Sequence, residues 1–261
     1  MTLLGRIAVV GNGRMGTALA SGLISGLVSG LGSIAVVEGP FGRGFDGAGF
    51  DIVLLAVPDG QIAAAAACIV DGPVIAHCAG SLGLAVLGDR PGFALHPLMT
   101  VTRSGATFTG AGAAVAGSSP ETLAIAHRLA EVLGLAAVEV DDDDRAAYHA
   151  AVSIASNFLV TLEDAAEALF ATTGMERALL VPLVRAAVET WADLGGPAAL
   201  TGPVARGDEA TIARQRAAVI ERAPYLLELF DTMTTATRAL AARTGGATSS
   251  RSGSPVSRPQ P

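Results

Sequence analysis

Lysine is absent from this chain of 261 residues, so all 17 basic side chains are arginines. Without a lysine, no side-chain amine can form a Schiff base, and no ammonium group can serve as an acid. The absence therefore excludes these two kinds of catalysis.

Cysteine and aromatic residues are scarce as well. The two cysteines, Cys68 and Cys78, lack metal-ligand spacing and lie in apolar surroundings, which is typical of reduced thiols. Aromatic residues make up only 4% of a chain that is 51% hydrophobic, so aliphatic side chains must build the core. The first residues lack a basic segment with a cleavage site, and we expect a cytoplasmic protein.

Positive charge is also in deficit, because the net charge is −7 and the pI is near 5.0. An acidic protein lacks the basic surface that nucleic acids and anionic membranes require. Residues 15–37 carry no charge, but Gly30 and Gly32 break them into a helix of about 14 residues and a short strand, too short for a bilayer. We therefore expect neither nucleic-acid nor membrane partners.

The first half of the chain alternates between short apolar runs and helical segments. Strands are predicted at residues 6–10, 33–38, 51–58, 73–78, 92–96, 112–117 and 135–140, with helices after residue 16, near 62–69 and over 120–133. Uninterrupted apolar runs are typical of parallel strands covered on both faces. The pattern predicts an α/β fold, with a doubly wound Rossmann-type parallel sheet over residues 1–141.

The second half has helical periodicity, which is interrupted at residues 173–174, 194–208 and 223–224. Four consecutive aspartates, residues 141–144, indicate the start of its first helix. We predict a smaller all-helical domain of about four helices over residues 142–244. The Gly-, Ser- and Pro-rich residues 245–261 are predicted to be disordered.

The segment GNGRMG, residues 11–16, joins the first predicted strand to the first predicted helix. Gly11 permits a tight turn, Gly13 lets the backbone approach a pyrophosphate, and Gly16 lets the helix pack on the strand. Backbone amides at the helix start would hold the phosphate charge. The pattern predicts NAD(P)H as cofactor, in contact with Gly11, Asn12, Gly13, Arg14, Met15, Gly16, Val57 and Pro58.

Glu38 ends the second predicted strand, 22 residues after Gly16. A carboxylate in this position accepts a hydrogen bond from the adenosine ribose and repels a 2′-phosphate, which favours NAD. Arg14 and Arg43 favour NADP instead, so both cofactors stay open. Residues 39–49 leave little room for the usual second helix and third strand.

A polar stripe interrupts the apolar helix that follows the aspartates. His149, Ser153, Ser156 and Asn157 fall within an arc of about 100° on an α-helix. Such a stripe is either a catalytic wall or a set of buried groups bonded to carbonyls one turn earlier. We take His149, Ser153 and Asn157 as candidate catalytic residues, since imidazole transfers protons near neutral pH.

Two further candidates lie near predicted strand ends. His96 precedes Pro97 at the sheet edge where α/β proteins bind ligands, and it either bonds a substrate oxygen or caps the strand. Ser81 lies in the loop after HCAG, where a plain turn serine is the alternative to a substrate contact.

Several segments of the chain carry a family resemblance: VGNGRMGTAL, DIVLLAVPDGQI, HCAGSLGLAVL, HPLMT, YHAAVSIASNFLVTL and LTGPVARGD. Over about residues 5–240 the chain resembles the β-hydroxyacid dehydrogenase, ketopantoate reductase and pyrroline-carboxylate reductase group, which joins a nucleotide domain to a helical one. More closely, it resembles a two-domain Rossmann-like family whose helical half long carried only an unknown-function label. Prephenate dehydrogenases show a similar His-Pro pair.

The resemblance has consequences for the site. The larger group places a proton-donating Lys and an Asn on the first long helix of the second domain. Asn157 matches that Asn, while Ser153 and His149 stand one and two turns earlier, so a proton relay would use these residues or a water. The resemblance also implies that Ser81 lies near the nicotinamide and that Arg206 grips a substrate carboxylate, although an interdomain ion pair is as common for such an arginine.

We therefore expect an NAD(P)H-dependent oxidoreductase that reduces the ketone of a small oxo acid, with 2-dehydropantoate (ketopantoate) implied by the resemblance. The alternatives are a pyrroline-5-carboxylate- or prephenate-type dehydrogenase, or a sensor that binds NAD(P) without turnover. The partner is a small-molecule carboxylate. Apolar helices such as 176–194 predict a homodimer.

Overall fold

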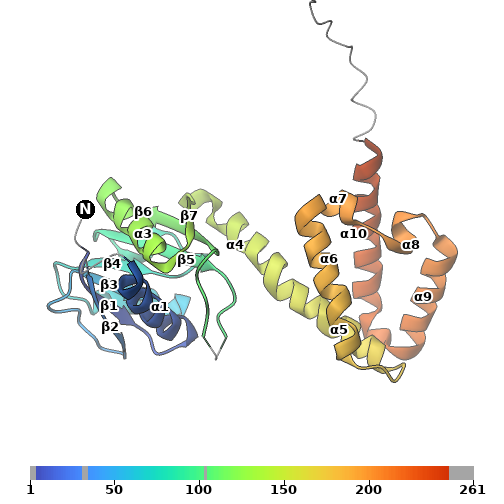
Figure 1. Cartoon of the computed structure of the whole chain (residues 1–261), viewed down its shortest axis with the longest axis horizontal. Helices are drawn as coiled ribbons and strands as arrows, with labels where there is room; N and C mark the ends of the chain where they lie inside the picture. Colours follow the sequence, from blue (N-terminus) through green and yellow to red (C-terminus); the bar gives the residue numbers. More distant parts are fainter. Residues whose placement is uncertain (1–3, 31–34, 103–104, 247–261) are drawn as a thin grey trace, which may run out of the picture. The chain divides into compact units, whose positions relative to one another are not determined.

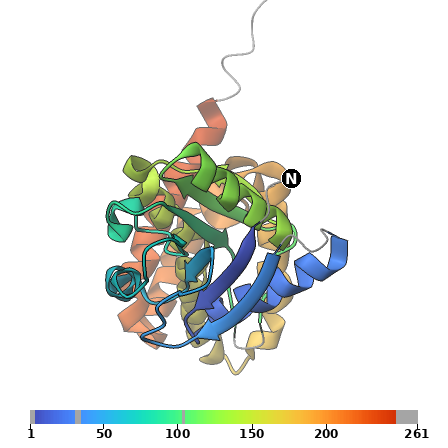
Figure 2. The ribbon, with the colours of Figure 1, turned by 90° about the vertical axis from the view of Figure 1, so that its left-hand side faces the viewer.

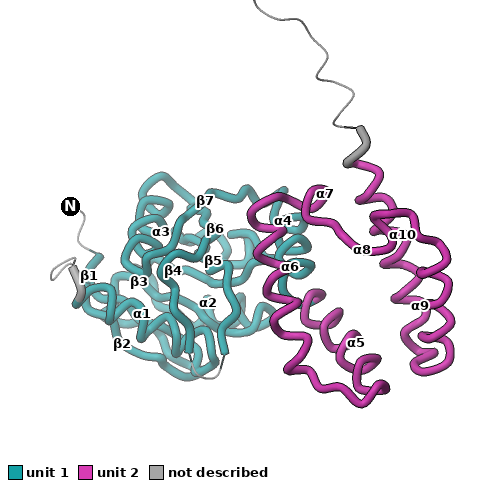
Figure 3. The backbone as a smooth tube through the Cα atoms, turned by 45° about the vertical axis from the view of Figure 1, so that its right-hand side comes forward, with its two compact units in different colours: residues 1–157 teal, residues 158–261 magenta. Residues whose placement is uncertain are grey.

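The computed structural model describes residues 4–30, 35–102 and 105–246. The chain forms two compact units, residues 1–157 and residues 158–261, drawn in teal and magenta in Figure 3. The division lies 16 residues after the expected boundary at Asp141. The reason is local, because Arg145, at the start of the helix that follows the aspartates, is buried within unit 1.

Unit 1 is built on a seven-stranded sheet, counted over the described residues, in the order β2-β1-β3-β4-β5-β6-β7. The strands are β1 (Gly5–Val10), β2 (Ala35–Phe41), β3 (Ile52–Leu55), β4 (Val74–His77), β5 (Gly92–Leu98), β6 (Gly112–Gly117) and β7 (Ala136–Glu139). Neighbouring strands are parallel except β5 and β6, which pair antiparallel. The predicted doubly wound α/β fold is confirmed. The prediction did not include the antiparallel pair. A parallel neighbour needs a crossover, usually a helix, and the described part of residues 99–111 has no helix, so β6 runs antiparallel to β5.

Helices cover both faces of this sheet (Figure 1 and Figure 2). α1 (Arg14–Gly30) and α3 (Pro120–Leu133) contribute to one core cluster, while α2 (Ile62–Ala67) and the short helix η2 (Leu84–Leu87) contribute to the other. Side chains of β1 alternate between the two clusters, with Ile7 and Val9 in the first and Ala8 and Val10 in the second. This period of two is what a strand buried on both faces requires.

The predicted helix over residues 120–133 is confirmed as α3, and its ends explain its bounds. Ser119 and Thr122 form a capping box, and Pro120 occupies the first turn, where its missing N–H costs nothing. Gly134 ends the helix in the left-handed conformation, with φ of 72°.

β2 continues to Phe41, three residues beyond the predicted end at Glu38, and no helix separates it from β3 in the described residues. The short connection instead holds a cluster of rings: Phe41 stacks on Phe45 at 4.1 Å between centroids, and Phe50 meets both edge-on. The expected shortage of room for a further helix and strand is thus confirmed.

The aspartate run opens a long helical segment, as predicted. A 3-10 turn, η3 (Asp142–Asp144), leads into α4 (Arg145–Ser153), which continues through a π-helical turn, η4 (Ile154–Phe158). Asp142 accepts a hydrogen bond from Arg145 Nε at 3.0 Å and another from the backbone N–H of Leu84 at 3.2 Å. These bonds tie the start of α4 to the loop after β4.

Unit 2 is all-helical in its described residues, as predicted. Its helices are α5 (Leu159–Ala171), η5 (Arg177–Leu179), α6 (Val181–Leu194), α7 (Gly196–Ala199), α8 (Gly202–Ala205), α9 (Glu209–Arg222), η6 (Pro224–Leu226) and α10 (Leu227–Gly246). The breaks fall at the predicted places. The predicted disordered tail lies, from residue 247 on, outside the described residues.

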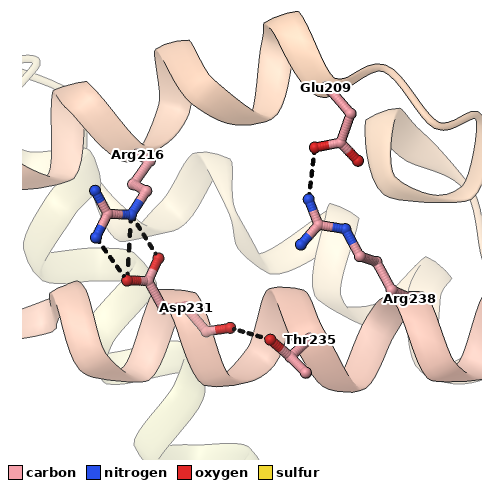
Figure 4. Close-up of polar contacts among 5 residues, drawn as sticks. All are labelled: Glu209, Arg216, Asp231, Thr235 and Arg238. Carbon is pink, nitrogen blue, oxygen red and sulfur yellow. Dashed lines mark hydrogen bonds and ion pairs between the residues drawn. The ribbon is translucent and has the colours of Figure 1, made fainter.

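Two ion pairs join α9 to α10 (Figure 4). Arg216 approaches both carboxylate oxygens of Asp231, with Nε at 2.9 Å and 3.2 Å and Nη2 at 2.9 Å, and Arg238 meets Glu209 at 2.6 Å. Both pairs are about half exposed, so solvent screens the charges and the pairs add little to stability. Over the described residues, no helix combines the length and the apolar character that crossing a bilayer demands.

Candidate active site

The glycine turn between β1 and α1 has the geometry that its sequence predicts. Gly11 has a φ of 121°, and a Cβ there would lie 2.2 Å from the carbonyl oxygen of Ala56. A Cβ on Gly16 would lie 1.9 Å from the carbonyl oxygen of Gly11, so helix and turn touch. Around Gly13, by contrast, a Cβ would meet no atom within 4 Å, and the backbone is open to a ligand.

A cavity of about 740 Å³ opens beside this turn, between the ends of β1 and β3. The chain leaves β1 toward β2 on one side and β3 toward β4 on the other, so the cavity lies where the strand order reverses. Open α/β sheets bind ligands at that point. Residues lining the cavity include Gly11, Gly13, Arg43, Phe45, Val57 and Pro58.

The predicted cofactor contacts take different places around this cavity. Asn12 lines it together with the four predicted residues Gly11, Gly13, Val57 and Pro58. Arg14 instead lines a neighbouring groove of about 1210 Å³ along α1, which Asn12 and Gly13 also reach. Met15 packs against the core, and Gly16 provides the contact between helix and turn. The fit of a dinucleotide thus depends on the open backbone at Gly13 and the mainly apolar walls of the 740 Å³ cavity.

Glu38 lies earlier in its strand than expected. The structure places it inside β2, opposite Ala8 and three residues before the strand end, where its carboxylate pairs with Arg6 at 2.6 Å. It is not among the residues that line the cavity, and its contact with the adenosine ribose stays a prediction. Arg43, after the end of β2, is the charged residue among those that line the cavity.

Polar side chains gather at the carboxyl ends of β3, β4 and β5. Asp59 follows Pro58 of the cavity wall, and its carboxylate accepts a hydrogen bond from Ser81 Oγ at 2.8 Å. Ser81 follows Gly80, against which two imidazoles pack: a Cβ on Gly80 would lie 2.7 Å from atoms of both His96 and His149. Asp59, Ser81 and Gly80 therefore connect the wall of the cofactor cavity to a pair of histidines.

A tyrosine that the sequence analysis did not single out contacts the histidine pair. Tyr148 Oη lies 2.7 Å from His96 Nδ1, a hydrogen-bond distance. The His96 ring is also 6.1 Å from the His149 ring, between centroids. His96, Tyr148 and His149 thus form one polar cluster, which we call the His-Tyr cluster.

Burial and a nearby charge set the protonation states around this cluster. Burial lowers the pKa of His96 to about 4, and the charges of His149 and Arg145 act in the same direction. Burial raises the pKa of Tyr148 to about 12, against the effect of Arg145. At neutral pH, His96 is therefore neutral and Tyr148 keeps its proton.

Arg145 is the most unusual member of the surroundings. Its side chain is only 1% exposed, and neither terminal nitrogen has a hydrogen-bond partner among the described residues. Beside it, burial lowers the pKa of His77 to about 4, and the Arg145 charge adds to that effect. A buried guanidinium with a single bonded nitrogen is electrostatically costly. Its charge acts to lower the pKa values of His77, His96 and Tyr148.

The rest of the predicted stripe is arranged differently. Ser156 donates to the carbonyl of Val152 at 2.8 Å, which is the bond one turn back that a structural serine makes. Ser153 is half-buried and Asn157 is exposed. The π-helical turn widens the helix from Ile154 on, so the spacing of 100° per residue does not extend to Asn157.

Arg206 lies in unit 2, exposed, at the end of α8. Next to it, Asp208 caps α9 by accepting a hydrogen bond from the backbone of Thr211 at 3.0 Å, as the sequence predicts. The cap at Asp208 therefore fixes the backbone two residues after Arg206, whose guanidinium is exposed. Its role as a carboxylate clamp stays a prediction.

Tyr148 and Arg145 are the site residues that sequence reasoning missed. The signal was present in the spacing, because residues three apart lie on one side of an α-helix. Arg145 and Tyr148 therefore share the side of α4 that turns toward the sheet.

Comparison with known proteins gives one partial family match and several similar folds. Residues 111–237 match the model described as domain of unknown function DUF2520. No curated protein matches the chain. A solved protein from Bacteroides fragilis, provisionally described as an NADP oxidoreductase, shares 20% identity with a TM-score of 0.73, over 90% of this chain and 98% of its own.

Two further solved structures are similar over nearly the whole chain. A Thermotoga maritima protein is 20% identical with a TM-score of 0.71, over 92% of this chain and 98% of its own. A reductive aminase from Aspergillus terreus, solved with NADPH and ethyl-5-oxohexanoate, is 18% identical with a TM-score of 0.59, over 95% of both chains. At these identities the likeness shows the fold, a Rossmann-like domain followed by a helical region.

Proposed function

We propose that this chain is an NADPH-dependent reductase of a small carbonyl compound, with the ketone of 2-dehydropantoate as the first substrate to test. The observation that carries the proposal is the placing of the His-Tyr cluster next to the dinucleotide cavity, along the carboxyl ends of β3, β4 and β5. One edge of the sheet thereby offers both a cofactor site and groups able to supply a proton.

The residues that would hold the cofactor are those of the glycine turn and the cavity wall. Gly13 and the first turn of α1 offer backbone amides to the pyrophosphate. Arg43 offers a cation where an adenosine 2′-phosphate would lie, and Glu38 is bound to Arg6 elsewhere, so we favour NADPH over NADH. When bound, the cofactor supplies a hydride to the substrate carbon.

The remaining predicted residues complete the substrate site. His149 contacts the substrate, and His96 lies beside it through its contact with Tyr148. Ser81 orients the loop through Asp59, and Ser153 and Asn157 extend the wall of α4. Arg206 is our proposed clamp for a substrate carboxylate, because a guanidinium can hold a carboxylate through two bonds. The chain lacks lysine, so the proton must come from one of the groups of the His-Tyr cluster or from water.

A cyclic imine is the second candidate substrate, because similar folds include pyrroline-5-carboxylate reductases and an imine reductase. The test is NADPH binding by fluorescence, followed by loss of nicotinamide absorbance with 2-dehydropantoate or 1-pyrroline-5-carboxylate. Prephenate is tested in the oxidative direction with NADP⁺. Turnover of one compound is expected, whereas tight binding of NADPH without any turnover would favour a sensor.

We also propose that the protein is a homodimer joined through unit 2. α6 exposes Leu183, Trp191 and Leu194 to 66%, 60% and 59%, and these three residues lie within about 80° of each other around the helix. In all of the described part of unit 2, the buried hydrophobic residues are Ile212, Val219 and Ala223. An apolar stripe of this kind is typical of an interface.

A further inference from the structure

Tyr148 differs in its surroundings from the other tyrosine of the chain. The sequence has two tyrosines, and Tyr225 is 73% exposed on unit 2. Tyr148 is half-buried on α4, and its ring meets the His96 ring edge-on at 5.7 Å between centroids. Its hydroxyl is held at the sheet edge by the 2.7 Å contact with His96 Nδ1.

The contact with His96 determines which way the phenol can point. A neutral imidazole carries one N–H and one acceptor nitrogen. With the proton on Nδ1, His96 donates to the phenolic oxygen, and the O–H hydrogen of Tyr148 is free to bond a substrate. With the proton on the other nitrogen, Tyr148 would donate to His96 and its proton would be committed.

Arg145 acts on the same hydroxyl from the buried side. It stands three residues before Tyr148 on α4, and its positive charge favours loss of the Tyr148 proton. Its Nε is paired with the Asp142 carboxylate at 3.0 Å, whereas its two terminal nitrogens have no partner among the described residues. Because burial weakens the screening of charge, Arg145 offsets part of the cost that burial imposes on a developing phenolate.

We propose that Tyr148 donates the proton to the substrate heteroatom, with His96 and Arg145 as positioning residues. This inference rests on the proposed reductase function. As hydride arrives at carbon, the π pair of the C=O or C=N bond moves to the heteroatom and takes the Tyr148 proton. The O–H bond of Tyr148 breaks, leaving a phenolate that accepts a hydrogen bond from His96 and lies in the field of Arg145. A proton from solvent then restores the phenol.

His149 is the rival donor, because its ring packs on Gly80 beside His96. The two hypotheses differ in one substitution each. Tyr148→Phe keeps the ring and removes only the hydroxyl, whereas His149→Gln keeps a polar group and removes the imidazole. If Tyr148 is the donor, the single-turnover rate falls by about two to four orders of magnitude in Tyr148→Phe and by less in His149→Gln.

The matched control is Tyr225→Phe, the same chemical change at the exposed tyrosine. Its rate is expected to equal that of the unaltered chain. NADPH affinity, measured by fluorescence titration, is expected to stay the same in all three variants, since the His-Tyr cluster is not part of the cavity lining. An unchanged rate in Tyr148→Phe overturns the inference and leaves the reductase function standing.

A second measurement does not depend on turnover. The nitrogen-15 spectrum of the full chain reports which ring nitrogen of His96 carries the proton. Protonated Nδ1 in the unaltered chain, with loss of that preference in Tyr148→Phe, supports the inference. Protonation of the other nitrogen means that Tyr148 donates to His96, and it overturns the inference.

Arg145 is tested as a positioning residue by Arg145→Met and Arg145→Lys. Loss of the charge is expected to slow turnover about tenfold and to move the acid limb of the pH profile upward, because His96 loses one cause of its low pKa. Lysine, which keeps the charge, is expected to restore the profile in part. An unaltered chain that binds no NADPH, or that reduces none of the test compounds, overturns the reductase function and the inference with it.

Discussion

Arg6 and Glu38 form an ion pair across the neighbouring strands β1 and β2, with 2.6 Å between Nη2 and Oε1. The Arg6 guanidinium also donates to the carbonyl of Gly49 at 2.9 Å and lies 4.5 Å from the centre of the Phe50 ring. Glu38 is therefore held at the edge strand by several contacts to its partner. Arg43 is left as the charged side chain beside the cofactor cavity.

The first prediction concerns cofactor choice. Arg43→Ala is expected to weaken NADPH binding by about 10- to 100-fold, because a charge-assisted hydrogen bond contributes about 1.5–3 kcal/mol. NADH binding is expected to change little, since NADH lacks the 2′-phosphate. Fluorescence titration with both cofactors gives the ratio.

Glu38→Gln is the control for that prediction. It removes the charge of the Arg6 pair without touching the cavity, so the ratio of NADPH to NADH affinity is expected to stay constant. A shift of this ratio toward NADPH in Glu38→Gln, with none in Arg43→Ala, would return Glu38 to the ribose position.

The second prediction separates binding from folding within the glycine turn. Gly13→Ala is expected to leave the free energy of unfolding within about 0.5 kcal/mol, because its Cβ meets no protein atom, and yet to weaken NADPH binding about tenfold or more. Gly16→Ala is expected to lose about 1–3 kcal/mol, because its Cβ would overlap the Gly11 carbonyl. Denaturant unfolding and NADPH titration of both variants provide the test, and equal stability losses would contradict it.

Features set by residues close in sequence were predicted, whereas features set by contacts between distant segments were not. The glycine turn and the alternation of strands and helices depend on neighbours in sequence, and they were predicted correctly. The continuation of β2 past Glu38 was missed because Gly39 and Pro40 are strand breakers in isolation. β2 is an edge strand, where proline is tolerated, and the pairing with β1 shifts register between Ala8 and Val10.

The site was predicted less completely for the same reason. His96 was expected to end its strand, but β5 continues through Pro97 to Leu98, because these residues pair with β6. Whether Tyr148 and Arg145 face the sheet or the solvent depends on what α4 packs against. That packing involves residues far away in sequence, such as His96, so the local sequence does not reveal it. The π-helical turn was missed because angular arithmetic on a helix assumes α geometry throughout.

The third prediction concerns Gly80, the residue between the two imidazoles. A Cβ there would come within 2.7 Å of His96 and His149, so Gly80→Ala must displace at least one ring. A displacement of about 1 Å at a catalytic group costs roughly 100-fold in rate. We expect kcat to fall by about that factor with NADPH affinity unchanged.

Gly60→Ala is the matched control, because a Cβ on Gly60 meets nothing within 4 Å. Steady-state kinetics with the substrate identified for the unaltered chain compares the two variants. Equal activity in both would show that the imidazoles are not needed where they lie.

The fourth prediction concerns stability against pH. The pKa of His96 is lowered to about 4 in the folded chain, while an unfolded histidine titrates near 6.5. Between these values the unfolded state binds more protons, so this histidine makes no difference above about pH 7 and destabilises the fold progressively down to pH 4. His77 acts in the same sense.

The measurement is denaturant unfolding at pH 7 and pH 4.5. His96→Gln is expected to reduce the loss of stability between these pH values by about 1–2 kcal/mol. A steeper loss in His96→Gln would mean that the folded state favours the protonated ring, contrary to the effect of burial.

The fifth prediction concerns assembly through α6. Leu183, Trp191 and Leu194 are each more than half exposed, and a charge at the first of them would have to be desolvated in an apolar interface. Light scattering is expected to give about twice 26.0 kDa for the unaltered chain and a mass near 26.0 kDa for Leu183→Glu.

Val28→Glu is the matched control, because Val28 is an 83% exposed hydrophobic residue on α1 of unit 1. It should remain dimeric if the interface belongs to unit 2, and circular dichroism should show the same helix content in both variants. A monomeric unaltered chain would remove the dimer and leave α6 with an exposed apolar stripe that needs a different partner. Dissociation by Val28→Glu instead would move the interface to unit 1.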